Sequence, residues 1–189
     1  MSDYINHMRD RIERARARAI KREHDRFKII NGHAKIELPN WQWGFIEQMS
    51  NAKADRFNGS TSRKQKKGIA GEFATQLYFK ESPPQIQMGK DYGVDLVVAG
   101  GTCDVKATNY GNSYLVFPYD GAFKADLAVL ALVDWGKAVH LAGWITKKEW
   151  CERAQSLDFG IGRGPARVVE VQQLNKIQKL KEFDERFNH

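Results

Sequence analysis

The chain has 189 residues, 42% of them hydrophobic and 28% charged, which is the balance of a globular protein with one substantial core. Its 10 Phe, 6 Tyr and 5 Trp exclude a chain that is disordered throughout. The longest wholly apolar run, residues 127–133, is far shorter than the roughly 20 residues of a membrane-spanning helix, so we expect no membrane partner. The charged N-terminus resembles no secretory signal and two cysteines form no disulfide framework, so we expect a cytoplasmic protein.

The formal charge of +7 is concentrated near the N-terminus. Residues 1–30 hold nine basic and five acidic side chains, and residues 53–67 hold six basic side chains and one acidic. This asymmetry suits a phosphate backbone, although a solvated helix followed by a basic loop would show the same pattern. We expect contacts with DNA from a set of basic residues in these segments: Arg14, Arg18, Arg22, Arg63, Lys64, Lys66 and Lys67.

Residues 3–28 contain neither Gly nor Pro and predict a helix that ends at Asn31-Gly32. Its apolar stripe would pack on the body, with pairing of two subunits or contact with a duplex as alternatives.

A second helix is predicted over residues 40–51. It contains Trp41 and Trp43, which we expect in the core, although indoles also stack on bases. Residues 55–63 predict a loop.

Residues 64–80 predict a helix that ends before Ser82-Pro83-Pro84. Strand-like runs follow, with Gly100-Gly101 as a hairpin turn signal, at residues 85–88, 94–99, 102–108, 114–117, 126–133 and 138–145. Thr146 and Glu149 have the spacing of a capping box, and a last strand at 168–171 and a terminal helix from 175 complete the pattern. We therefore expect an α/β fold with a mixed sheet, divided into a basic helical extension (1–52) and a main domain (53–189).

Candidate catalytic side chains gather in residues 89–108. Asp104 and Lys106 are two residues apart on one strand and therefore share a face, while Cys103, Val105 and Ala107 face the core. A tight hairpin would bring Asp95 beside Asp104. Two neighbouring carboxylates repel each other unless a cation or proton neutralises them, and such hard oxygen ligands suit Mg²⁺, with Mn²⁺ as a substitute. A nearby lysine would orient or deprotonate a water molecule.

Glu72 lies at the border of the apolar stripe of the preceding helix, from where it could reach the same site. In this order Glu72, Asp95 and Asp104-Val105-Lys106 resemble the motif of the PD-(D/E)XK nuclease superfamily, although Val94 stands where that motif has Pro. The resemblance implies a restriction-endonuclease-like core of α-β-β-β-α-β order. It also implies metal binding by Asp95, Asp104 and the Val105 carbonyl, assistance to the metal or water by Glu72, and positioning of the attacking water by Lys106.

The resemblance thus implies a Mg²⁺-dependent DNA nuclease that leaves 5′-phosphates. We expect a site-specific or structure-selective endonuclease, such as a junction resolvase, acting as a homodimer. Three alternatives stay open at this point. The acids and the lysine could form an ion pair on a solvated sheet face, the chain could be a nucleic-acid-binding module without catalysis, or the substrate could be RNA. The sequence does not separate DNA from RNA.

Overall fold

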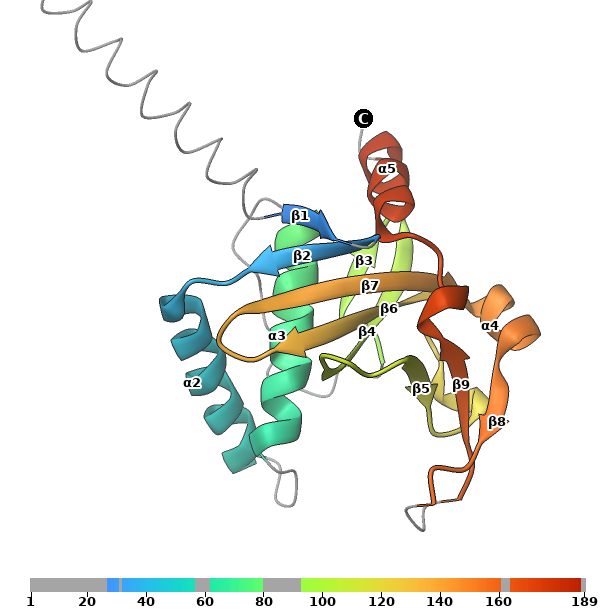
Figure 1. The fold of residues 1–189 in the computed structure, drawn as a ribbon, viewed down its shortest axis with the longest axis horizontal. Coiled ribbons are helices and arrows are strands. Elements are labelled where there is room, and N and C mark those ends of the chain that lie inside the picture. Colours follow the sequence, from blue (N-terminus) through green and yellow to red (C-terminus); the bar gives the residue numbers. More distant parts are fainter. Residues whose placement is uncertain (1–26, 31, 57–61, 80–92, 161–163, 188–189) are drawn as a thin grey trace, which may run out of the picture.

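The structure is a computed structural model that describes residues 27–30, 32–56, 62–79, 93–160 and 164–187. At its centre is a six-stranded mixed sheet with the strand order β1-β2-β7-β6-β4-β3, in which β4 and β6 are parallel and all other neighbours are antiparallel (Figure 1). Its strands are β1 (Phe27–Ile30), β2 (His33–Glu37), β3 (Leu96–Val98), β4 (Gly101–Asn109), β6 (Leu127–Asp134) and β7 (Ala138–Thr146).

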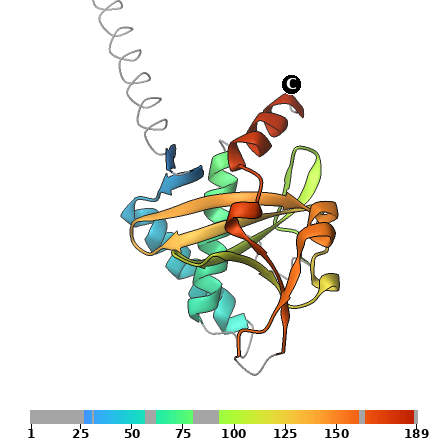
Figure 2. The same cartoon turned by 45° about the vertical axis from the view of Figure 1, so that its right-hand side comes forward.

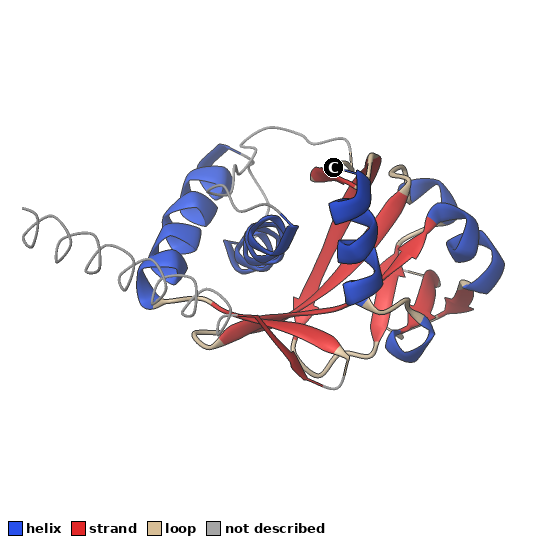
Figure 3. Ribbon diagram, turned by 90° about the horizontal axis from the view of Figure 1, so that it is seen from above, coloured by secondary structure: helices blue, strands red, loops and turns tan. Residues whose placement is uncertain are grey.

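Helices and a smaller sheet cover the two faces of the central sheet. One face carries α2 and α3, and the opposite side carries α4 and the three-stranded antiparallel sheet β5-β9-β8 (Figure 3). The helices are α2 (Asn40–Arg56), α3 (Ser62–Phe79), α4 (Lys147–Arg153) and α5 (Ile177–Phe187). The strands of the small sheet are β5 (Tyr114–Phe117), β8 (Gln155–Leu157) and β9 (Ala166–Glu170), and short 3₁₀ turns cover Asp120–Ala122 and Val171–Gln173.

This layered arrangement divides the hydrophobic core in two. The first cluster joins one face of the central sheet to α2, α3 and α5, and the second joins the other face to β5, β9 and α4. Strands β6 and β7 are apolar on both sides because both of their faces are covered, so they show a continuous apolar run instead of alternation. The mixed α/β class is therefore confirmed. The capping box predicted at Thr146 and Glu149 is confirmed at the start of α4.

The predicted N-terminal elements need correction. The helix expected over residues 3–28 lies largely outside the described residues, but its last two positions belong to β1. Gly32 turns the chain into β2 with φ +81°, and Ile30 pairs with His33. Gly32 thus lies between two paired strands, where the end of a helix was expected, and Asn-Gly between apolar residues is a common hairpin signal. The hairpin joins the central sheet through β2 and β7, and α2 continues across residue 52 to Arg56.

The order of elements also differs from the core that the resemblance implied. Between β5 and β6 the chain forms the 3₁₀ turn at Asp120–Ala122, where an α-helix was expected. The parallel pairing of β4 with β6 still requires a crossover, because two parallel neighbours cannot be joined by a tight turn. Strand β5, which pairs with β9 in the second sheet, provides that crossover. The strand predicted at residues 85–88 lies outside the described part.

Helix α3 approaches β4 most closely at Gly71. A Cβ atom at this position would be 2.8 Å from the Cβ of Ala107 and 3.1 Å from that of Ala131. Neither of those atoms is the end of a flexible side chain, so the helix would have to move away from the sheet. Gly71 therefore sets the spacing between α3, which carries Glu72, and the strand that carries Asp104.

We predict that Gly71→Ala lowers the free energy of unfolding by about 1–3 kcal/mol, because overpacking outweighs the better helix propensity of alanine. Gly44→Ala is the matched control. Gly44 is also inside a helix, but a Cβ there would meet no atom within 4 Å, so this change should raise the free energy of unfolding by about 0.5–1 kcal/mol. Urea unfolding measures both. A gain at Gly71 equal to that at Gly44 would contradict the close packing.

Candidate active site

The β3–β4 hairpin carries the site. Leu96 pairs with Cys103 and Val98 with Gly101, so the two turn residues are Ala99 and Gly100, one position earlier than the predicted Gly100-Gly101. Ala99 has φ +50° and Gly100 φ +74°, which is the left-handed backbone of a type I′ turn. Alanine is strained in this region by about 1 kcal/mol. The strained backbone at Ala99 is stabilised by a contact with another part of the chain.

That contact comes from the C-terminal helix. The buried Asp184 of α5 accepts a hydrogen bond from the Ala99 amide, with 2.7 Å between Oδ1 and N. Figure 2 shows the yellow-green hairpin rising beside the red α5 helix. A residue 85 positions away in the sequence thus fixes the tip of the hairpin whose base carries Asp95 and Asp104.

Asp95 lies just before β3, at the base of the hairpin. Its amide donates to the Cys103 carbonyl at 2.8 Å, and its carboxylate Oδ2 accepts from the Val105 amide at 2.6 Å. The Asp95 carboxylate therefore takes the place of the backbone acceptor that the Val105 amide would have if the β3–β4 ladder continued. This arrangement confirms that the hairpin register brings Asp95 next to the Asp104-Val105-Lys106 segment.

Asp104 and Lys106 lie together on the opposite face of β4 from the first core cluster. Lys106 Nζ donates to Asp104 Oδ1 at 2.6 Å and lies 4.9 Å from the centroid of the Phe117 ring. The Asp104 side chain is 2% exposed, whereas that of Lys106 is 36% exposed. Cys103 and Val105 are in the first core cluster and Ala107 packs against it, as predicted. Because Asp104 is buried, the ion pair does not lie on a solvated sheet face.

The charges of Asp95 and Asp104 both raise the pKa of one neighbouring residue, Cys103. Burial raises the pKa of the Cys103 thiol well above its ordinary value of 9.0, and the charges of Asp95 and Asp104 raise the pKa further. Cys103 is therefore a protonated, inert core residue. The shared effect also shows that the two carboxylates concentrate charge in one small region beside β4.

Glu72 lies on α3 directly after Gly71, the point where the helix meets Val105 and Ala107. A Cβ at Gly68 would be 3.7 Å from Glu72 Oε1, so the carboxylate extends back along the helix towards its N-terminus. Within the described ranges no three His, Cys, Asp or Glu side chains form a group that could hold a metal ion. Glu72 thus does not complete such a group with Asp95 and Asp104, and its role stays a prediction.

The sequence alone did not indicate Gly93, which lies next to the Asp104 carboxylate, or Lys124, which lies next to Gly93. Gly93 has φ +84°, and a Cβ there would lie 3.9 Å from Asp104 Oδ2 and 3.8 Å from the Cβ of Lys124. Gly93 therefore lies between the buried carboxylate and a second lysine. The positive φ explains a glycine at this position, but no local pattern links residue 93 to residue 124.

The basic residues expected to contact DNA are placed only in part. Arg14, Arg18 and Arg22 lie outside the described residues, and of Arg63 and Lys64 only the backbone, in the first turn of α3, is described. Lys66 forms an ion pair with Glu47 of α2, and Lys67 is half-buried on α3. A single face that unites these residues is not established, so this part of the prediction stays open.

Comparisons with protein-family models, with curated proteins and with solved structures gave no match. Among the described helices, none combines the length and the apolar character needed to cross a membrane.

We predict that Asp184→Ala lowers the free energy of unfolding by about 1–3 kcal/mol, because the Ala99 amide loses its acceptor in a partly buried position. Hydrogen exchange at residues 99–101 should also accelerate. The exposed Glu182 of the same helix provides the control, since Glu182→Ala should leave both quantities nearly unchanged. Unaltered exchange in Asp184→Ala would show that α5 does not hold the hairpin.

Proposed function

We propose that this chain is a Mg²⁺-dependent nuclease that hydrolyses phosphodiester bonds in DNA. The observation that carries the proposal is the position of the Asp95 carboxylate on the amide of Val105, the residue between Asp104 and Lys106. Two carboxylates and a lysine are thereby held in one corner of the sheet by backbone geometry. Structural ion pairs seldom need a second acid anchored in this way, whereas metal-assisted hydrolysis does.

The donor set of this corner fits Mg²⁺. Asp95 and Asp104 would hold the ion, together with the carbonyl of Val105. In a strand the N–H and C=O of one residue point to the same edge, so the Val105 carbonyl lies on the side where its amide meets Asp95. Since the β3 ladder ends at Leu96, paired with Cys103, that carbonyl lies beyond the paired segment.

A site of this type needs few protein ligands. Mg²⁺ usually keeps several waters and takes one or two carboxylates along with substrate phosphate oxygens. Two aspartates and a carbonyl meet that requirement without a third acidic side chain, so the lack of a three-residue group in the described ranges does not conflict with it. When bound, the ion would neutralise phosphate charge and lower the pKa of a bound water. Mn²⁺ would substitute because it prefers similar ligands.

Lys106 is placed to act on the attacking water. Its ammonium is held by Asp104 at 2.6 Å and its side chain is 36% exposed, so it links the buried acid to solvent. In the proposed reaction Lys106 orients a water molecule whose oxygen attacks phosphorus in line. The new P–O bond forms as the bond to the 3′ oxygen breaks. The attacking water releases one proton to solvent, and the leaving 3′ oxygen takes one proton from solvent. The ammonium charge also stabilises the additional negative charge of the transition state.

The same proposal includes a restriction-endonuclease-like arrangement of the core. It is supported by the helix α3 that carries an acid, followed by the β3–β4 hairpin with acids on both strands. The 3₁₀ turn between β5 and β6 is a departure from that order. The basic segments N-terminal to this site and at the start of α3 support a nucleic acid as the substrate, and DNA is proposed with RNA as the alternative. Cutting of both strands would further require a homodimer.

We predict that Asp95→Ala, Asp104→Ala and Lys106→Ala each reduce cleavage at least about 100-fold, because each removes part of the charge stabilisation at phosphate. Cleavage is measured with Mg²⁺, Mn²⁺ or EDTA on supercoiled, linear, single-stranded and four-way-junction DNA and on RNA. EDTA should abolish it. Binding should persist in Asp104→Ala and Lys106→Ala.

The matched controls for this experiment are Asp134→Ala and Lys137→Ala, which disrupt another acid–lysine pair of the same sheet, 3.6 Å apart at the β6–β7 turn. Both should retain cleavage within about twofold, the range expected for surface ion pairs. Full activity of Asp104→Ala or Lys106→Ala would refute the site. Binding without cleavage under every condition would identify a nucleic-acid-binding module, and preference for RNA would change the substrate class.

We also predict that removing residues 1–26 weakens DNA binding and flattens its dependence on salt. This segment holds eight basic and five acidic side chains, and each phosphate contact that it makes would add about 0.9 to the slope of log K against log salt. The deletion ends before β1, so the central sheet keeps all its strands. Anisotropy titrations of a labelled duplex between about 50 and 300 mM KCl measure the slope; an unchanged slope would assign the contacts to other residues.

A further inference from the structure

Large aromatic side chains gather at the exposed end of α2, far along the sheet from Asp104. Trp41 is 68% exposed and Phe45 36% exposed, which corrects the expectation that Trp41 lies in the core, whereas Trp43 packs against the edge of the first core cluster, as expected in part. Trp43 is half-buried and meets Trp135 of the β6–β7 turn, with ring centroids 5.4 Å apart and a 50° angle between the planes. Trp135 is 38% exposed and Trp43 is only half-buried, so the two indoles present aromatic surface to solvent at one place.

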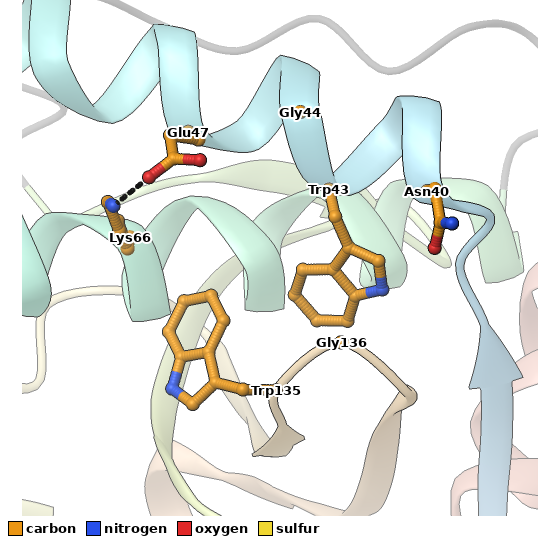
Figure 4. Close-up of a pocket in the computed structure, with 7 residues that line it drawn as sticks. All are labelled: Asn40, Trp43, Gly44, Glu47, Lys66, Trp135 and Gly136. Carbon is orange, nitrogen blue, oxygen red and sulfur yellow. Dashed lines mark hydrogen bonds and ion pairs between the residues drawn. The ribbon is translucent and has the colours of Figure 1, made fainter.

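The two indoles line a groove. Trp43, Gly44 and Glu47 of α2 form one wall, Lys66 of α3 closes one end, and Trp135 and Gly136 form the other wall (Figure 4). Asn40 lies at the opposite end from the Lys66–Glu47 ion pair, as the close-up shows. The groove thus has flat apolar walls between two polar ends, which is the usual composition of a small-molecule site.

We propose that this groove binds an unpaired nucleobase of the DNA strand; this rests on the proposed nuclease function and goes beyond it. A base has an apolar ring that stacks on indole faces and an edge with hydrogen-bond donors and acceptors. Asn40 offers one donor group and one acceptor to such an edge, and the Lys66–Glu47 pair offers charged groups at the other end. Stacking on aromatic side chains requires no particular sequence, because every base has a ring face.

The charge around the groove favours nucleic acid over an apolar protein segment. Lys66, which lines the groove, belongs to the stretch Ser62–Lys67 of α3, where four of six residues are basic and none is acidic. Within the groove Glu47 balances the charge of Lys66, so the positive charge comes from the sequence of the helix start beside it. Aromatic walls next to such a basic segment combine the two elements of single-strand binding sites, a stacking surface and basic residues for the phosphates. A protein side chain packed on the exposed faces of the indoles would make no use of those basic residues.

The position of the groove indicates recognition, not catalysis. Asp104 pairs with Ala128 in the parallel β4–β6 ladder, and Trp135 follows the end of β6. At about 3.3 Å per residue the groove is roughly 20 Å from the carboxylates, which corresponds to about six nucleotides at B-DNA spacing. A base bound there would select DNA that is unpaired near the cleavage point. Its loss should therefore change binding and leave the chemical step unaltered.

The test measures binding of the full chain in EDTA, so that no cleavage interferes, to a fluorescein-labelled dT20 strand and to a blunt duplex of the same length. Trp135→Ala should raise the Kd for dT20 about tenfold, as expected for loss of one stacked base, and should leave the Kd for the duplex within about twofold. Trp135→Phe should restore most of the affinity. The control Phe183→Ala removes an exposed aromatic of α5 and should change neither Kd.

Equal Kd values of Trp135→Ala and the unaltered chain for dT20, or equal losses on dT20 and duplex, would overturn the proposal. A second measurement needs no variant: dT20 should quench the tryptophan fluorescence of the unaltered chain, and binding without quenching would also overturn it. The two proposals fail separately. Single-strand binding that depends on Trp135, without metal-dependent cleavage, would refute the nuclease function and support base binding in the groove. Metal-dependent cleavage, with single-strand binding unchanged in Trp135→Ala, would support the nuclease function and refute base binding in the groove.

Discussion

The hydrogen bond from the Val105 amide to the Asp95 carboxylate organises the part of the molecule on which its chemistry would depend. Strand β3 is an edge strand of three residues, and its ladder with β4 ends at Leu96. Backbone pairing alone would not fix the direction of the Asp95 side chain. The bond to Val105 places a carboxylate where the next strand residue would pair. The bond therefore holds the Asp95 carboxylate beside the segment that carries Asp104, at the base of the short hairpin.

Packing from both sides supports this corner. At Gly71, α3 presses so closely on β4 that a methyl group would not fit, and on the other face Lys106 lies over Phe117. Asp104, on the face with Lys106, is 1% exposed, and a buried carboxylate is costly unless a cation and hydrogen bonds compensate it. Lys106 supplies one cation from within the same strand. In this buried position the attraction between the Asp104 carboxylate and the Lys106 ammonium is stronger than it would be in water.

Much of this could be predicted from the sequence because local rules apply to it. Alternation on β4 separated Asp104 and Lys106 from Cys103 and Val105, and the spacing of Thr146 and Glu149 indicated the start of α4. The β1–β2 hairpin was missed because residues 3–28, which contain neither Gly nor Pro, were assigned to one helix and Asn31-Gly32 was interpreted as its end. Contacts between distant segments had no local signal. Asp184 reaches Ala99 across 85 positions, and Trp43 meets Trp135 only because α2 packs near the β6–β7 turn.

The parallel pairing of β4 with β6 relates the two proposed sites to each other. Because the strands run in the same direction, the acids near the start of β4 lie at one end of the ladder and Trp135, after β6, lies beyond the other end. An antiparallel neighbour would have brought its following turn back beside Asp104. The crossover through β5 is what makes the parallel pairing possible, so the second sheet contributes to the separation of the proposed catalytic site from the proposed base-binding groove. In a nuclease built this way, the length of a rigid sheet would set how far from a bound base the strand is cut.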